Sequence, residues 1–218
     1  MKKPSICAVV VNNDPKGLKA VEPLVDLFEL RIDLIGEGWE EVARQFRKPW
    51  IACNRCVDEG GKGQADETER VEKLFQAIEL GAGFIDVELR TKNLAKIVPL
   101  IKKRARCILS FHDLAKTPSF DEMREMVNRQ LKAGADISKV VTTARSFEDN
   151  LAVLQLIPAF PGVKLVTFAM GPVGAISRVL APLVGAEFIY ASIEAGKESA
   201  PGQITVRDLI SIYNIVEQ

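Results

Sequence analysis

Short segments rich in branched and aromatic residues recur along this chain of 218 residues, and amphipathic segments separate most of them. The eight apolar segments cover residues 5–11, 25–31, 50–55, 84–89, 105–111, 139–143, 163–169 and 187–192. Between them, apolar residues recur three and four positions apart, which is the spacing of one helix face. Alternating strands and helices predict parallel strands, and eight such units favour an α/β fold of the (β/α)8 TIM barrel type over an open doubly wound sheet.

Glycine and proline lie at the joints between these units, for example at Gly81, Gly134 and Gly185, and no linker-like stretch interrupts the pattern. The chain shows no repeat beyond the strand–helix unit itself. We therefore expect residues 1–218 to form a single (β/α)8 barrel domain.

Composition narrows the classes of protein that the chain can belong to. Lysine and arginine number 29, as do aspartate and glutamate, so no excess of positive charge points to nucleic acid or an acidic membrane surface. The apolar run 6–11 is too short for a signal-peptide core or a membrane span. We expect a cytoplasmic protein with no nucleic-acid or membrane partner.

Four cysteines do not suggest a disulfide scaffold in a chain of this size. Cys53 and Cys56 form a C-x-x-C, but zinc needs about four ligands and neither a second pair nor a histidine cluster occurs. We interpret these cysteines as packing residues and expect no metal.

The chain contains one histidine, His112, at the point where the run 105–111 gives way to Asp113. Junctions between strands and loops are where α/β barrels place their chemistry, so His112 is a candidate for proton transfer. The alternative is a surface or capping histidine without a chemical role.

Alternation within strands places several polar side chains on one face. Glu29, Arg31 and Asp33 alternate with apolar neighbours, and so do Asp86 and Glu88. Burying charge is costly unless the charge is paired or used, so these residues indicate either a salt-bridged barrel interior or a functional site.

Two lysines, Lys139 and Lys164, fall inside apolar runs, where desolvation favours a nucleophilic amine. Lys164 would lie roughly 20 Å below the carboxyl end of its strand, at about 3.3 Å per residue, whereas Lys139 is nearer the mouth. A buried structural role for Lys139 stays open.

Glycine-containing loops follow the third and seventh apolar segments. Residues 59–63 lack the spacing of a Walker loop and are interpreted as a flexible loop. Residues 171–174 open a helix that carries Arg178, in the region where many barrels bind an anion.

Across nearly its whole length the sequence resembles the type I 3-dehydroquinate dehydratases, the Schiff-base enzymes of the shikimate pathway. The resemblance rests on ordered motifs: Glu29-Leu-Arg-Ile-Asp33, Arg55 with Glu59-Gly-Gly61, Ile85-Asp-Val-Glu88, Ser110-Phe-His-Asp113, Ala135-Asp-Ile-Ser-Lys139, Met170-Gly171 with Ser177-Arg178, and Ser199-Ala-Pro-Gly-Gln203. It implies dehydration of 3-dehydroquinate to 3-dehydroshikimate with no metal or dissociable cofactor, and often a homodimer.

The resemblance also implies roles for individual residues. Lys139 would form an imine with the substrate ketone, His112 would be the general acid and base, and Glu59 would orient the histidine. Lys139 would need a lowered pKa to attack. The resemblance implies substrate-binding roles for Glu29, Arg31 and Arg55 at ring hydroxyls, Asp86 behind Arg55, Met170 against the ring, and Arg178, Ser199 and Gln203 around the carboxylate.

One position departs from the family pattern, because Cys53 stands where relatives commonly have threonine, which puts one hydroxyl contact in doubt. Two rival interpretations are a class I aldolase-like Schiff-base barrel that acts on a phosphosugar, and a non-catalytic barrel that binds a small acid. Both keep Lys139 and Arg178 but give them different tasks.

Overall fold

Eight parallel strands form the centre of the molecule, in a computed structural model that describes residues 4–63 and 66–216. The strands are β1 (Ile6–Val10), β2 (Leu27–Arg31), β3 (Trp50–Cys53), β4 (Phe84–Glu88), β5 (Arg106–His112), β6 (Ile137–Thr143), β7 (Leu165–Met170) and β8 (Ile189–Ser192). They are hydrogen-bonded in the order β7-β6-β5-β4-β3-β2-β1-β8. The prediction of a (β/α)8 TIM barrel is confirmed, with every strand end within two residues of the expected one. Residues 1–3, 64–65 and 217–218 of the expected single domain lie outside the described residues.

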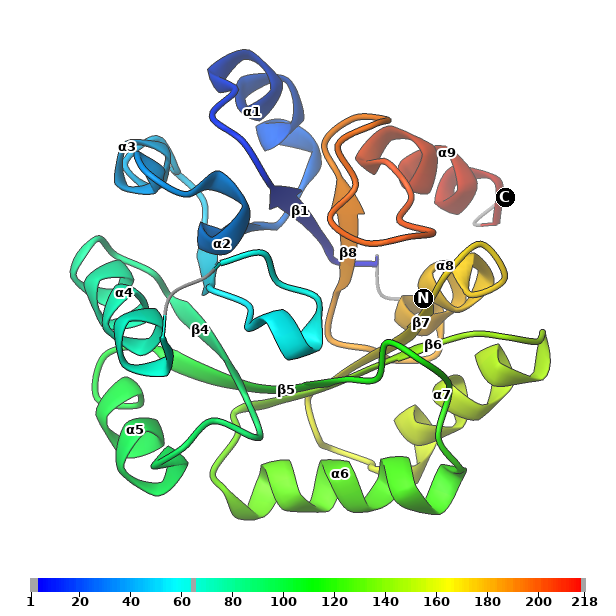
Figure 1. The fold of residues 1–218 in the computed structure, drawn as a ribbon. Coiled ribbons are helices and arrows are strands. Elements are labelled where there is room, and N and C mark those ends of the chain that lie inside the picture. The colour runs from blue at the N-terminus through cyan, green and yellow to red at the C-terminus, as the bar shows by residue number, and fades with distance from the viewer. Residues whose placement is uncertain (1–3, 64–65, 217–218) are drawn as a thin grey trace.

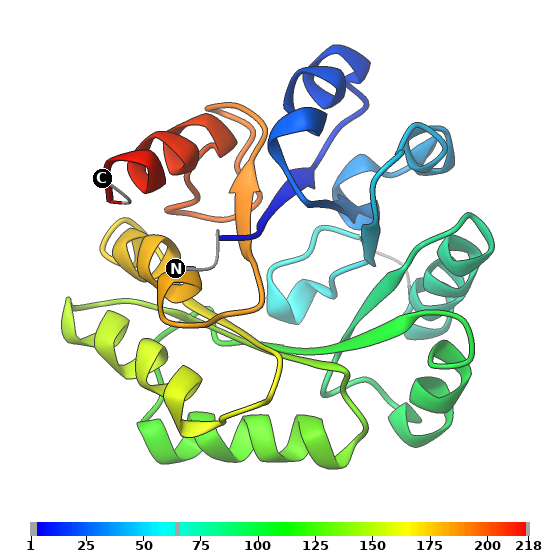
Figure 2. The ribbon, with the colours of Figure 1, turned by 180° about the vertical axis from the view of Figure 1, so that it is seen from behind.

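Helices surround the strands on all sides in Figure 1 and, from behind, in Figure 2. The helices are α1 (Pro15–Val21), α2 (Ile32–Ile35), α3 (Trp39–Ala43), α4 (Glu67–Glu79), α5 (Leu94–Ile101), α6 (Phe120–Lys132), α7 (Glu148–Ala159), α8 (Ala175–Leu183) and α9 (Val206–Val216), with short 3-10 helices η1 (Glu22–Leu24) and η2 (Val57–Glu59). In the described part of the chain, none of them is both long and apolar enough to span a membrane.

Local sequence explains where the outer helices begin. Ser119 caps α6: its hydroxyl accepts a hydrogen bond from the backbone of Glu122, whose carboxylate in turn accepts one from the backbone of Ser119. Asp14 caps α1 in a similar way, and Pro15 occupies the first turn, where its missing N–H costs nothing. These two caps fix where the connections into α1 and α6 end.

The strands alternate as predicted, with apolar side chains toward the helices and polar ones toward the interior. Phe28 and Leu30 are at most 1% exposed, and the Phe28 ring stacks on Phe46 with centroids 4.9 Å apart. Burial of this apolar surface is the main stabilising contribution to the fold. The alternation predicted to continue as far as Asp33 is wrong, because β2 ends at Arg31 and α2 begins at the next residue.

The barrel is nearly closed between β7 and β8, which are the two ends of the hydrogen-bonded order. The backbone N–H of Glu187 donates to the carbonyl of Leu165 at 2.9 Å across this seam. Higher up, the rings of Phe168 and Tyr190 meet edge to face with centroids 6.2 Å apart. Side-chain packing therefore joins the two strands where ladder pairing is lacking.

Candidate active site

A pocket of about 610 Å³, counting its open mouth, lies at the carboxyl ends of the strands. All the site residues predicted from the sequence line this pocket except Asp86, whose side chain is fully buried behind it. The lining consists of Glu29, Arg31, Cys53, Arg55, Glu59, Gly60, His112, Leu114, Lys139, Val141, Phe168, Met170, Arg178, Tyr190, Ser199, Ala200, Pro201 and Gln203. The carboxyl face of a (β/α)8 barrel is where catalysis occurs in this fold.

Lys139 extends from the middle of β6 into the pocket and is only 4% exposed. Its Nζ lies 2.8 Å from Asp86 Oδ2 and 3.5 Å from Glu29 Oε1. Burial alone would lower the pKa of this amine, but the two carboxylates outweigh burial and raise it. The lowered pKa that a nucleophilic lysine needs is thus not found in the resting protein, where Lys139 is an ion-paired ammonium.

Lys164, the other lysine candidate, lies outside the pocket. It directly precedes β7, its side chain is 47% exposed, and its Nζ pairs with Glu187 Oε1 at 2.6 Å. The expectation that Lys164 is an interior residue is therefore wrong, because β7 begins one residue later and leaves this lysine at the surface.

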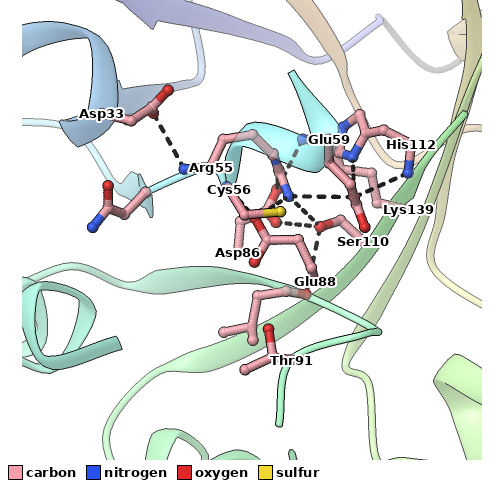
Figure 3. A network of polar contacts seen from close by, with 12 residues as sticks. Asp33, Arg55, Cys56, Glu59, Asp86, Glu88, Thr91, Ser110, His112 and Lys139 are labelled. Atoms are coloured by element: carbon pink, nitrogen blue, oxygen red, sulfur yellow. Dashed lines mark hydrogen bonds and ion pairs between the residues drawn. The ribbon is translucent and has the colours of Figure 1, made fainter. Parts of the chain in front are cut away.

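Arg55 connects the floor of the pocket to the carboxylates of β4 (Figure 3). Its guanidinium lies 2.8 Å from Asp86 Oδ2 and 3.0 Å from Glu88 Oε1, and it donates to Ser110 Oγ at 2.7 Å. Although burial opposes ionisation, the cations of Arg55 and Lys139 hold the pKa of Asp86 well below its usual range. The floor is therefore a network of paired charges.

His112 ends β5 and is held by Glu59, which comes from the loop after β3. One carboxylate oxygen, Oε2, accepts the backbone N–H of His112 at 3.0 Å and lies 2.8 Å from the ring Nδ1. Burial is the largest cause that raises the pKa of Glu59 to about 7. Burial, with the nearby cations of Arg55 and Lys139, lowers the pKa of His112 well below its usual value. The imidazole is therefore neutral at pH 7.

The tautomer of His112 follows from this contact. When Glu59 is ionised, its carboxylate only accepts hydrogen bonds, so in that state Nδ1 carries the hydrogen that points to Glu59. The other ring nitrogen, Nε2, then keeps its lone pair and can accept a proton. This arrangement suits a general base, and the surface-histidine alternative does not fit a side chain that is 10% exposed.

The loop that carries Glu59 is tightly packed, although the sequence predicted a flexible loop at 59–63. Its first turn is the 3-10 helix η2, and it lies over the centre of the barrel in Figure 1. A Cβ at Gly61 would collide with the carbonyl of Arg55, so only glycine allows this close approach. The backbone N–H of Lys62 donates to Asp33 at 3.2 Å and fixes the far side.

Asp33 has a second role at this point, because it forms a two-pronged ion pair with Arg31 at 2.9 and 2.7 Å. Arg31 lines the pocket, but its guanidinium nitrogens Nε and Nη2 both donate to Asp33. Asp33 thus orients both Arg31 and the loop after β3.

Arg178 occupies the opposite wall and differs from every other buried cation of the pocket. It is 1% exposed, its guanidinium stacks 4.2 Å from the centroid of the Phe168 ring, and its Nε has no partner among the described residues. Its Nη2 donates a long hydrogen bond of 3.5 Å to the carbonyl of Pro201. Burial alone lowers its pKa to about 9, which leaves it a cation at neutral pH.

The loop between β8 and α9 closes this wall. Gln203 Oε1 accepts from the backbone and the hydroxyl of Ser199 at 2.8 and 3.2 Å. The carbonyl of Pro201 accepts the backbone N–H of Gly171 at 3.0 Å, which attaches this loop to the one after β7. Met170, 7% exposed, lines the pocket from the end of β7.

The two cysteines of the C-x-x-C are free thiols, with Cys53 buried in the pocket wall and Cys56 half-buried. Among the described residues, Cys53, Glu29 and Asp86 have ligand atoms within 4.8 Å of one another. Lys139 and Arg55 already pair with these carboxylates, and burial raises the pKa of the Cys53 thiol, which keeps it protonated. The group is therefore better described as part of the ion-pair network than as metal ligands.

Sequence reasoning missed several residues that shape the pocket. Phe168 and Tyr190 line it and lie against Arg178 and Lys139 respectively. Phe168 lies two residues before Met170 on the same strand face, so alternation could have found it. Arg70 was not detectable in this way, because it reaches Glu88 from α4 at 2.6 Å.

The nearly closed barrel and this pocket, with its imidazole–carboxylate pair and a buried Arg178 guanidinium that has no carboxylate partner among the described residues, are typical of the class of barrel enzymes that act on small anionic substrates. Comparison with known proteins narrows this class to one family. A sequence model described as "Type I 3-dehydroquinase" matches residues 6–218. The chain belongs to this family.

Curated and solved relatives agree. A 3-dehydroquinate dehydratase of Dehalococcoides mccartyi is 40% identical over 217 residues, which covers 99% of this chain and 97% of the relative. One from Methanocaldococcus jannaschii is 37% identical and covers 97% and 99%. The crystal structure of the Geobacillus kaustophilus 3-dehydroquinate dehydratase superposes with a TM-score of 0.87 at 26% identity, covering 99% and 92%. The protein is accordingly a hydro-lyase, a type I 3-dehydroquinate dehydratase of the shikimate pathway.

Proposed function

We propose that this enzyme dehydrates 3-dehydroquinate through a Schiff base on Lys139. The amine attacks the C3 ketone, the carbonyl oxygen leaves as water, and the nitrogen becomes part of a protonated imine. The ammonium must first lose a proton, but the iminium that follows carries the same single positive charge. Asp86 and Glu29, which lie 2.8 and 3.5 Å from Nζ, therefore face one cation before and after the reaction.

His112 is the general base and then the general acid of the proposal. Its free Nε2 removes the proton from C2, next to the iminium, which acts as an electron sink for the carbanion or enamine that forms. The protonated imidazole then assists the departure of the C1 hydroxyl as water. Glu59 supports both steps, because its carboxylate holds Nδ1–H and stabilises the imidazolium.

Arg178 binds the substrate carboxylate in this proposal. Its unpartnered Nε and its planar guanidinium suit a two-pronged contact with a carboxylate, and the apolar wall around it makes that contact strong. Ser199 and Gln203 close over the same group from the loop after β8.

The remaining predicted residues hold the ring. Glu29, Arg31 and Arg55 line the pocket and bind ring hydroxyls, while Met170 packs against the carbon ring. Asp86 acts from behind, because it pairs with both Arg55 and Lys139.

One observation carries the proposal: the buried amine of Lys139, the free imidazole nitrogen of His112 and the unpaired guanidinium of Arg178 face a single pocket. The test is reductive trapping with borohydride, read by mass spectrometry of the peptide that contains Lys139. We expect a mass shift with 3-dehydroquinate and none with a phosphosugar, which would instead trap on an aldolase-like barrel. Lys139→Met is the matched control and should trap nothing while remaining folded.

His112→Ala separates the two chemical steps. We expect it to form the trapped adduct while turnover falls by about 100- to 10,000-fold, the usual contribution of a general acid and base. Near-normal turnover, or no trapped adduct in the wild type, would contradict the proposal.

We also propose that the single barrel is a cytoplasmic homodimer. Phe147 and Leu151 are exposed on and beside α7, and Val173 and Ile176 are exposed on the adjoining α8 region. Exposed apolar groups of this kind are typical of interfaces. Light scattering should give the dimer mass for the wild type and the monomer mass for Leu151→Asp.

A further inference from the structure

Tyr190 lies beside the reactive amine, and nothing described so far gives it a task. The tyrosine belongs to β8, is 3% exposed and lines the pocket. Its ring centroid is 4.2 Å from Lys139 Nζ, which lies over the ring face. This is within the range of a cation–π contact, and the absence of bulk water at a buried site makes such a contact stronger.

The ring is held in this orientation by two other aromatic side chains. Phe188 meets it edge to face with centroids 5.3 Å apart and an interplanar angle of 82°, and Phe168 meets it at 6.2 Å and 65°. Both contacts have the geometry that aromatic quadrupoles favour. The face of Tyr190 is therefore fixed toward Lys139 by the packing of β7 and β8.

The hydroxyl group of Tyr190 is not what contacts Lys139. It is buried and has no hydrogen-bond partner among the described residues. Burial, together with the carboxylates of Glu29 and Asp86, raises its pKa well above the usual value, so it stays a neutral phenol. The ring and the hydroxyl can thus be separated by mutation.

We propose that the ring of Tyr190 is a positioning residue that stabilises the cation on Lys139 once this nitrogen is joined to the substrate. The inference rests on the Schiff base proposed above. It adds a stabilising contact on the reacting nitrogen that differs in kind from those of Asp86 and Glu29.

The number of N–H groups explains why such a contact matters. The ammonium has three N–H donors and the ketone has none; their condensation releases one water and leaves an iminium with one N–H and the same charge. Hydrogen-bonded pairing with carboxylates, at 2.8 and 3.5 Å in the resting protein, loses donors in this step. Attraction to a ring face needs no donor, so it persists when the hydrogen bonds decrease.

The experiment compares Tyr190→Phe with Tyr190→Leu in the intact enzyme. Tyr190→Phe keeps the ring and removes only the unpartnered hydroxyl, so kcat/KM and the trapped fraction should stay within about twofold of the wild type. Tyr190→Leu removes the ring face, and we expect kcat/KM and the borohydride-trapped fraction to fall about tenfold, since a cation–π contact contributes on the order of 1 to 2 kcal/mol at a buried site.

Tyr213→Leu is the matched control, because Tyr213 is a buried tyrosine of α9 that bonds the carbonyl of Val179 and lies away from the pocket lining. It should lose stability and keep its trapped fraction. Wild-type trapping in Tyr190→Leu would overturn the inference, and so would an equal loss in Tyr190→Phe and Tyr190→Leu. Failure of the wild type itself to trap would instead overturn the Schiff base.

Discussion

Two buried cations face the same pocket under opposite conditions. Lys139 lies between the carboxylates of Asp86 and Glu29, whereas Arg178 contacts an aromatic ring and a distant carbonyl but no carboxylate of residues 4–63 and 66–216. The protein neutralises the first charge itself. In the proposed function, the substrate carboxylate neutralises the second charge, and until it binds the folded chain bears the cost of desolvating the Arg178 guanidinium.

The difference separates the pocket into two regions. The half formed by β2 to β6 holds a network of fixed ion pairs around Lys139 Nζ, which suits the proposed reaction because the charge on this nitrogen is the same before and after it. In the proposed function, the half formed by β7 and β8 is a preformed anion site. Chemistry and binding therefore depend on different walls, and mutations should separate them.

The largest expected effect is on the paired half. Asp86→Asn keeps the shape of the side chain but leaves Lys139 and Arg55 without their shared carboxylate. We expect the free energy of unfolding to fall by about 3 to 5 kcal/mol, as when one partner of a buried ion pair is removed. Urea denaturation measures it, and a loss below about 1 kcal/mol would show that the network is not what holds the floor together.

The opposite result is expected at the unpaired cation. Arg178→Met introduces an apolar side chain in place of a buried charge that has no counter-ion in the part of the chain that the structure describes. KM should rise about 100-fold, which corresponds to about 3 kcal/mol of lost carboxylate binding, while the free energy of unfolding should stay equal or increase. Steady-state kinetics and urea denaturation on the same preparation check both parts. A variant that loses stability and keeps its KM contradicts the contrast drawn here.

A smaller effect concerns the pH dependence of the acid–base pair. In the proposed mechanism, the active state has an ionised Glu59, whose pKa is about 7, and a neutral His112, so kcat/KM should rise with pH and level off above about pH 7. Below that pH it should fall about tenfold per unit. In Glu59→Gln, the acidic fall of kcat/KM should move to lower pH, because only His112, whose pKa is depressed, still titrates. If this fall stayed at the same pH, another group would be responsible for it.

The same group links pH to stability. The folded-state pKa of Glu59 lies above its ordinary value of 4.5, so the folded protein retains this proton as the pH rises from 4.5 to 7. Its contribution to stability is therefore complete below pH 4.5 and is lost as the pH rises through 7. The stability of Glu59→Gln relative to the wild type should accordingly increase from pH 5 to pH 8 in urea unfolding.

The smallest effect is expected for Cys53→Thr. Cys53 is 1% exposed, and burial raises the pKa of its thiol, so this side chain does not supply a thiolate. We expect less than a threefold change in kcat/KM and at most about 1 kcal/mol in unfolding free energy, as for similar-sized substitutions in cores. A large gain in activity would show that a hydroxyl contact is missing from the native pocket.

The periodicity of apolar residues alone was enough to predict the barrel, because strands buried on both faces and amphipathic helices space their apolar residues differently. Ordered motifs placed ten of the eleven predicted site residues around one pocket, with Asp86 directly behind it. Ion-pair partners were harder to predict. Arg70 reaches Glu88 from a helix, and Asp33 turns back to Arg31 from a short helix, so neither pairing follows from alternation within a strand.

The raised pKa of Lys139 could not be read from the sequence either. Burial and carboxylate pairing act in opposite directions, and only distances decide between them. The lack of a carboxylate next to Arg178, within the described residues, could not be predicted either, because the motif that contains this arginine indicates an anion site but not the partners of the guanidinium.

The contact between the loops after β7 and β8 limits which residues can occupy position 202. Gly202 has a φ of 76°, and a Cβ there would strike the backbone carbonyl of Gly171. Any side chain at this position would push apart the two segments that enclose the wall around Arg178, including the Pro201 carbonyl next to this arginine. Position 202 is therefore a point of low mutational tolerance although it bears no functional group, and a library that randomised this loop would recover active clones only with glycine retained.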